Sequence, residues 1–258
     1  MSLIKNWVLL LSLLFTAAPL SLLSDDSNTE KQLSLEIYPK WYSQDDITIQ
    51  GNIGVEKLFQ QHDWVTYYAK PSATYALDRN WALHGGLGFY YTDNKTFGNT
   101  REWRPFVGLS HYTNFTDKWA ISSYFRTEER FHNNIGSDNK SETTRLRLRF
   151  RNSYKLNPLG NAHSWHKMTL DLEGFKSFNN ETDVASAYKY DYETRVTLGA
   201  ERSLNDNKKV RFELAWKYKT QATQISDSDI HTIFFKIQYF PSWGSRFRNR
   251  LHDRDVDE

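Results

Sequence analysis

The sequence of 258 residues contains no cysteine, and this absence excludes two classes of exported protein. A lipoprotein needs a cysteine to carry its lipid, and a disulfide scaffold needs cysteines in pairs. A chain without cysteine is instead suited to passage through an oxidising periplasm.

The sequence also lacks an excess of charge of one sign. It has 33 basic and 31 acidic residues, which gives a formal net charge of +2. Nucleic-acid-binding proteins usually carry a clear basic excess, so the composition implies no nucleic-acid partner.

No apolar run in the sequence is long enough for a membrane-spanning helix, which needs roughly 20 residues. The longest run, from Trp7 to Phe15, follows Lys5 and precedes small and then acidic residues. This order is typical of a secretory signal peptide. We expect a signal peptide at residues 1–24, with cleavage near Ser24.

The sequence is hydrophilic on average, with a mean hydropathy of −0.71, yet aromatic residues make up 16% of it. A transmembrane β-barrel explains this combination, because every second residue faces a polar lumen and aromatic residues gather at both membrane interfaces.

Residues 143–157, TTRLRLRFRNSYKLN, show the alternation most clearly. Side chains two residues apart share one face of a strand, whereas a helix would scatter them around its circumference. The segment therefore predicts a strand with a basic face and an apolar face. The basic face carries Arg145, Arg147, Arg149 and Arg151, and the apolar face carries Leu146, Leu148 and Phe150.

Nine further segments alternate in the same way and are long enough for tilted spanning strands of roughly 9 to 11 residues. With the arginine segment they give ten predicted strands: residues 47–59, 64–77, 81–91, 101–112, 119–131, 143–157, 166–175, 192–204, 209–219 and 230–240. Their polar columns carry further charges, among them Glu102, Arg104, Glu193, Arg195, Glu201, Arg211, Glu213 and Lys236, with more basic than acidic residues in total.

The joints between these segments alternate between short turns and longer polar loops, as in bacterial outer-membrane barrels. The short joints are 77–80, 114–117 and 204–207, and residues 157–164 fall at a short-turn position. Residues 60–63 are the exception, because this joint is short where the alternation requires a long loop. An even number of strands would leave both termini in the periplasm. We therefore expect a periplasmic segment at 25–46, the barrel at 47–240 and a charged periplasmic tail at 241–258. Residues 33–42 also alternate, so twelve strands are the alternative.

Four segments in order, YALDRNWALHGGLGFYYTDN, TREWRPFVGLSHY, YFRTEERFHNN and TTRLRLRFRNSYKLNPL, resemble the uncharacterised barrel family known as domain of unknown function 2490. The resemblance covers most of the mature chain and implies an outer-membrane barrel without an established activity. A looser resemblance, to oligogalacturonate-specific porins, rests on Trp103, Arg104, Pro105 and the arginine-rich polar face. One departure is the chain end, because outer-membrane barrels usually finish on an aromatic residue, whereas this chain continues past Phe240.

The arginine segment has two readings inside a barrel. Lipid favours the apolar face, and the lumen receives the arginines, because a charged side chain facing lipid at midplane costs roughly 2 to 4 kcal/mol. Neighbouring strands then supply carboxylates, and the result is either a closed ion-pair lattice or a small channel whose basic lumen attracts anionic or small polar solutes. The candidate lumen or binding residues are Arg126, Glu128, Arg130, Arg145, Arg147, Arg149, Arg151, Asp171 and Glu173.

The sequence does not predict an enzyme. His84 and Ser110 are lumen candidates on neighbouring segments, and His163 and His166 lie near a turn, but no spacing specifies a catalytic triad or a metal site. A lipid-modifying enzyme at the barrel rim and a water-soluble β-sandwich are the weaker alternatives.

The sequence thus predicts an all-β fold, a transmembrane antiparallel up-and-down β-barrel of about ten strands. We expect it to be monomeric, in the outer membrane of a Gram-negative bacterium, without cofactor. The expected partners are outer-membrane lipid, lipopolysaccharide and the barrel-assembly machinery.

Overall fold

The computed structural model describes residues 29–44, 46–59, 64–94, 98–136, 140–156, 165–179, 189–205, 208–222 and 227–241. The expected signal peptide at 1–24 and nearly all of the expected tail lie outside these residues. The described chain forms twelve strands: β1 (Thr29–Ile37), β2 (Lys40–Gln44), β3 (Ile47–Phe59), β4 (Trp64–Ala76), β5 (Trp81–Asn94), β6 (Thr100–Asn114), β7 (Trp119–Asn134), β8 (Lys140–Lys155), β9 (Trp165–Asn179), β10 (Lys189–Asn205), β11 (Lys208–Ala222) and β12 (Asp227–Pro241).

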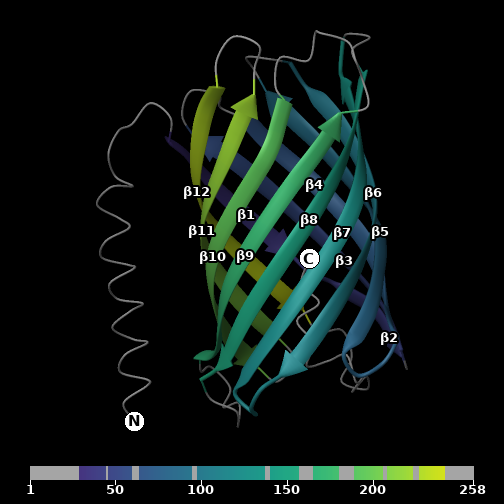
Figure 1. Ribbon diagram of the computed structural model, residues 1–258, viewed down its shortest axis with the longest axis vertical. Helices are drawn as coiled ribbons and strands as arrows, with labels where there is room; N and C mark the ends of the chain where they lie inside the picture. The colour runs from purple at the N-terminus through teal and green to yellow at the C-terminus, as the bar shows by residue number, and fades with distance from the viewer. Residues whose placement is uncertain are drawn as a thin grey trace.

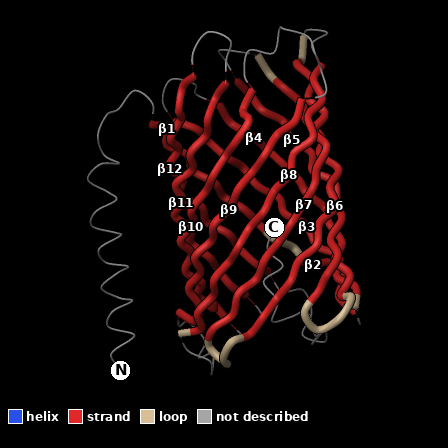
Figure 2. Tube along the Cα trace, in the orientation of Figure 1, coloured by secondary structure: helices blue, strands red, loops and turns tan. Residues whose placement is uncertain are grey.

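The strands close into a barrel, as predicted (Figure 1). From β3 to β12 each strand pairs antiparallel with the next, and β1 closes the ring by pairing with both β12 and β3. The ring thus contains eleven strands, and β2 is an extra strand beside the start of β3. Figure 2 shows the described chain as strands joined by short loops, with the strands tilted against the long axis, as barrel closure requires.

All ten predicted strands are present, and the segment that the sequence left as an alternative is a strand as well. β1 pairs with Ile53–Phe59 and β2 with Ile47–Gln50, so residues 29–44 run once along the length of β3. The described barrel therefore begins at Thr29 rather than at residue 47.

The pair that closes the ring, β1 with β12, is parallel. The expectation of an even number of strands, with both termini at one end of the barrel, is therefore wrong. Thr29 pairs with His231 and Ile37 with Tyr239, so both strands run in the same direction. An odd ring of strands that otherwise alternate in direction must contain one parallel pair. Thr29 and Pro241 consequently lie at opposite ends of the barrel.

Two short joints are held by side chains that satisfy backbone N–H groups. The Asp78 Oδ1 accepts hydrogen bonds from the N–H groups of Asn80 and Trp81, at 2.6 and 2.8 Å. The Thr116 Oγ1 accepts from Trp119 at 3.1 Å in the same manner. Asp and Thr are common in tight turns for this reason, so these joints form locally. We call this end of the barrel, which contains residues 77–80, the turn end, and the opposite end the loop end.

The outer surface of the barrel is apolar over its middle and aromatic near both ends. Aliphatic residues and phenylalanines occupy the middle, for example Ile53, Leu83, Val107, Leu148 and Leu172. Exposed aromatic residues near the turn end are Trp41, Tyr75, Trp81, Trp119, Tyr154 and Trp165, and those near the loop end are Phe59, Tyr67, Tyr91, Trp103, Phe178 and Tyr192. In the described part of the chain, no helix has the length and apolar character needed to cross a membrane.

The inside of the barrel is mostly polar, which reverses the arrangement of a water-soluble protein. The buried residues of the described strands include more polar and charged side chains than apolar ones. Only Ala76 and Ala82 form a buried apolar cluster there. The period-2 pattern of the strands produces this division, because alternate residues point to opposite faces of the sheet.

Candidate functional site

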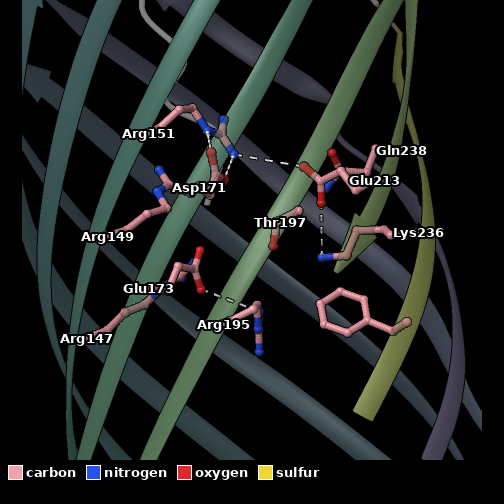
Figure 3. Close-up of a pocket in the computed structure, with 11 residues that line it drawn as sticks. Arg147, Arg149, Arg151, Asp171, Glu173, Arg195, Thr197, Glu213, Lys236 and Gln238 are labelled. Atoms are coloured by element: carbon pink, nitrogen blue, oxygen red, sulfur yellow. Dashed lines mark hydrogen bonds and ion pairs between the residues drawn. The ribbon is translucent and has the colours of Figure 1, made fainter. Parts of the chain in front are cut away.

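The arginine column of β8 points into the barrel, as the alternation predicts (Figure 3). Arg147, Arg149 and Arg151 are 8%, 5% and 3% exposed, whereas Leu148 and Phe150 between them are 45% and 48% exposed. A buried guanidinium needs a hydrogen-bonded counter-charge, since an unpaired buried charge is strongly unfavourable. The partners of these arginines therefore determine what the interior can do.

Two carboxylates of β9 pair with this column. Arg151 donates from Nε and Nη2 to the two carboxylate oxygens of Asp171, at 2.8 and 2.6 Å, in a bidentate ion pair. Arg147 Nη2 donates to Glu173 Oε1 at 2.8 Å. These are the two acids that the sequence placed opposite the column, and the strand register explains them, because Arg151 faces Asp171 directly across the β8–β9 pair.

Glu128 of β7 joins two arginines. Its carboxylate lies 2.9 Å from Arg126 Nη2 on its own strand and 2.5 Å from Arg145 Nη2 on β8. Arg130, which the sequence placed beside Glu128, instead donates from Nε to Glu102 Oε1 of β6 at 2.5 Å. Glu102 also accepts from Arg104 at 2.6 Å. The predicted residues of β7 thus belong to two neighbouring clusters.

Aromatic rings contact several of the interior arginines. Arg126 and Arg147 are directly opposite across the β7–β8 pair. Like charges at opposite positions destabilise a sheet. The guanidinium groups of Arg147 and Arg149 lie 5.8 and 5.3 Å from the ring of Tyr124. Those of Arg145, Arg147 and Arg195 lie 5.0 to 5.4 Å from the ring of Phe175. Cation–π contact of this kind is favourable and offsets part of the repulsion.

Charged residues beyond the predicted set extend this arrangement to other strands. We use the name interior network for these ion-paired side chains of the described barrel: Glu36, Glu102, Arg104, Arg126, Glu128, Arg130, Arg145, Arg147, Arg151, Lys167, Asp171, Glu173, Glu193, Arg195, Glu201, Lys209, Arg211, Glu213 and Lys236. Most of the added members stand in the polar columns of their strands. The alternating pattern is enough to place these residues on the inner face, but it does not predict which residue each of them contacts.

One chain of contacts in the network crosses the interior. Arg151 of β8 lies 3.9 Å from Glu213 of β11, with β9 and β10 between them in the sheet (Figure 3). Glu213 lies 3.9 Å from Lys236, and Lys236 lies 3.3 Å from Glu36 on β1. The side chains therefore connect β8 to the first strand of the barrel.

Glu36 anchors the closing strand. It accepts hydrogen bonds from the hydroxyl groups of Tyr38, at 2.6 Å, and of Tyr68, and from Gln238 Nε2 at 2.8 Å. Tyr68 reaches Glu36 from β4 by passing over Gly54 of β3, where an added Cβ would lie 2.5 Å from the Tyr68 ring. Glu36 was not among the predicted site residues, because residues 25–46 were expected in a periplasmic segment ahead of the barrel.

The fully buried charges of the described chain are balanced. Seven are basic and seven are acidic: Arg126, Arg147, Arg149, Arg151, Lys167, Arg211 and Lys217 against Glu36, Glu102, Glu128, Asp171, Glu173, Glu201 and Glu213. The basic excess expected from the polar columns comes from half-buried side chains such as Arg104, Arg145 and Arg195.

A cavity lies within the network, between β8 and β12 (Figure 3). Its volume is about 30 Å³. A cavity needs roughly 10 to 15 Å³ to hold one water molecule, so this space suits about two waters or a small ion. Its lining is Arg147, Arg149, Arg151, Asp171, Glu173, Arg195, Thr197, Glu213, Phe234, Lys236 and Gln238.

The histidine candidates have polar partners of their own. His84, which is 1% exposed, contacts the Ser110 hydroxyl through Nε2 at 2.8 Å and the Thr74 hydroxyl through Nδ1 at 3.0 Å. His166 lies 2.5 Å from Glu201 and 3.2 Å from Ser203, and His163 is outside the described residues. No cluster of three or more His, Asp or Glu side chains in the described strands is arranged to hold a metal ion.

The fold and its interior define a class of protein, a closed β-barrel with an apolar outside and an ion-paired inside. Residues 29–229 match the family described as protein of unknown function (DUF2490), and the chain belongs to this family. The curated proteins include none that matches the sequence. The family resemblance predicted from four segments is thereby confirmed, and the looser resemblance to oligogalacturonate-specific porins stays a prediction.

Proposed function

We propose that this protein is a bacterial outer-membrane β-barrel whose interior network closes it to solutes. The outer surface supports the membrane location, because an apolar band between two sets of aromatic residues is the pattern of a barrel in lipid. The expected signal peptide at residues 1–24 is consistent with export from a Gram-negative cytoplasm. Outer-membrane lipid, lipopolysaccharide and the barrel-assembly machinery are the partners in this proposal.

The observation that carries the closed state is the balance of the buried charges. Seven buried cations face seven buried anions, short ion pairs join the neighbouring strands β8 and β9, and Arg151 reaches Glu213 over two intervening strands at 3.9 Å. The cavity among them, at about 30 Å³, is too small for a sugar or an amino acid. A barrel of about eight strands is filled by its own side chains, and here long charged side chains fill a ring of eleven strands in the same way.

A small anion-attracting channel is the second candidate, and one observation favours it. The half-buried charges of the described interior are mainly basic, since Arg104, Arg130, Arg145, Arg195 and Lys236 stand against the acids Glu56 and Glu193. Basic groups near a low-dielectric wall concentrate anions. The protein has no catalytic role in either candidate, and the contacts of His84 with Ser110 and Thr74 are accounted for as interior packing.

Conductance in planar lipid bilayers tests the proposal. We expect the refolded chain without residues 1–24 to shift its gel mobility on heating, as folded barrels do, and to show no stable conductance steps of porin size. Steps of that size would contradict the closed barrel and support the channel. The reversal potential in a salt gradient, measured in the same recordings, would then show whether anions are preferred.

A further inference from the structure

The lining of the interior cavity has an excess of positive charge, although the buried charges of the described chain are balanced. Five basic residues line it, Arg147, Arg149, Arg151, Arg195 and Lys236, against the three acids Asp171, Glu173 and Glu213. The charges behind the lining reduce this excess without removing it, since Glu36, Glu56 and Glu193 stand against Arg211 and Lys217.

Several ion pairs around the cavity are longer than direct hydrogen bonds. Glu213 lies 3.9 Å from both Arg151 and Lys236, and Glu173 Oε2 lies 3.5 Å from Arg195 Nη1. Heavy-atom distances of N–H···O hydrogen bonds are 2.7 to 3.2 Å. The charged groups thus surround the space without closing it, and a small polar occupant can bridge them.

Two donors beside the cavity have no partner in the described structure. The Nε atoms of Arg147 and Arg195 are buried without a hydrogen bond. A water or ion that bridges to such a donor is one way to satisfy it, and at this cavity the two donors stand beside a space that can hold one. Phe234 completes the wall, with its ring 5.0 Å from Arg195 and 5.7 Å from Lys236.

We propose that this cavity binds one small monovalent anion of the halide class between Arg147, Arg195 and Lys236. The basic excess of the lining favours an anion over a cation, and the small volume of about 30 Å³ favours a halide over a larger oxyanion. Water is the competing occupant, because Glu173 Oε2 and Gln238 Oε1 are acceptors without a hydrogen-bond partner at the same cavity. Anion binding in this cavity requires neither conduction nor a membrane location. A negative result would therefore not contradict the proposed function, and a failure of the proposed function would not contradict anion binding.

Chloride-dependent thermal stability of the refolded chain in detergent provides the test, with sodium gluconate replacing sodium chloride at constant ionic strength. A ligand that binds only the folded state stabilises it by mass action. At a chloride concentration tenfold above the dissociation constant, the apparent unfolding constant is expected to fall about elevenfold. The stabilisation by chloride should also approach a single-site saturation curve as the chloride concentration rises. A melting temperature that is the same in chloride and gluconate would overturn the proposal in favour of water.

Two variants and one control locate the effect. Lys236→Gln removes a cavity charge, and folding is expected to survive because Glu36 keeps Tyr38, Tyr68 and Gln238 as donors. Thr197→Leu fills the cavity without changing any charge. Lys209→Gln is the charge-matched control, since Lys209 lies outside the cavity lining.

We expect the chloride dependence to be lost in Lys236→Gln and Thr197→Leu and retained in Lys209→Gln. A dependence of equal size in all four proteins would place the anion elsewhere and overturn the assignment. If Thr197→Leu does not fold, Lys236→Gln decides the question. A bromide ion in the cavity, located by anomalous scattering in crystals grown with bromide, would provide direct support.

Discussion

At the scale of single residues, the interior network depends on pairs in which neither partner can be removed alone. The Arg151 and Asp171 side chains are each 3% exposed and share a bidentate ion pair. Breaking a buried pair by removing one partner commonly costs about 3 to 5 kcal/mol, because the remaining charge is left uncompensated. Replacing both partners by apolar groups costs much less.

We therefore predict that Arg151→Met lowers the free energy of unfolding by about 3 to 5 kcal/mol. Adding Asp171→Leu should restore most of this loss. Urea unfolding of the refolded barrel in lipid vesicles measures both effects. Arg79→Gln in the exposed turn 77–80 is the control and should change stability by about 0.5 kcal/mol or less. A double variant as unstable as the single one would mean that Arg151 acts mainly through Glu213.

Tyr68 can contact Glu36 only because Gly54, which lies between them, has no side chain. An added Cβ at this position would lie 2.5 Å from the Tyr68 ring and hydroxyl, within the range that real Cβ atoms do not reach. Gly174, on β9, has open space around the same position. The two glycines therefore form a matched pair for one substitution.

We predict that Gly54→Ala destabilises the barrel by about 1 to 3 kcal/mol, because Tyr68 is displaced and Glu36 loses a donor. Gly174→Ala should be neutral within about 0.5 kcal/mol. In a Tyr68→Ala background, Gly54→Ala should cost little, since the clash is gone. The comparison uses urea unfolding midpoints of the parent protein and of the four variants. Equal effects of the two glycine substitutions would show that Tyr68 moves aside without loss.

At the scale of elements, alternation was sufficient to predict the strands but not their complete number. The period-2 pattern is strong in segments such as 143–157, because one face meets a charged interior and the other an apolar exterior. Residues 29–44 carry a weaker pattern. Pro39 separates β1 from β2, and a register shift between Lys40 and Tyr42 interrupts the alternation.

The sequence could predict contacts of the candidate site between residues that face each other across one strand pair. It could not predict the other contacts. Asp171 and Glu173 could be placed beside the arginine column from the hairpin order alone. The contact between Arg151 and Glu213 passes over two strands, and Arg130 pairs with Glu102 rather than with Glu128. These contacts depend on the barrel radius and on exact side-chain directions, which a linear pattern does not contain.

At the scale of the whole molecule, the parallel closure of the ring determines where the two ends of the barrel chain emerge. β1 runs alongside β12 from Thr29 beside His231 to Ile37 beside Tyr239. Thr29 therefore lies at the loop end, with the end of β7 at Asn134 and the start of β8 at Lys140, and Pro241 lies at the turn end, with residues 77–80. An even ring would have placed both ends of the chain at the turn end.

Protease accessibility on intact cells tests this arrangement, because the proposed outer-membrane location implies longer loops on the outside, as is usual for bacterial barrels. We predict that a protease-sensitive tag inserted at residues 137–139 is cleaved, and that a tag inserted directly before Thr29 is cleaved as well. Tags inserted at residues 77–80 or directly after Pro241 should be protected until the outer membrane is permeabilised. Heat-modifiable gel mobility confirms that each tagged protein is folded. Protection of the tag before Thr29, together with cleavage at 137–139, would contradict the parallel pairing of β1 with β12, because a strand that starts at the turn end can only close the ring antiparallel.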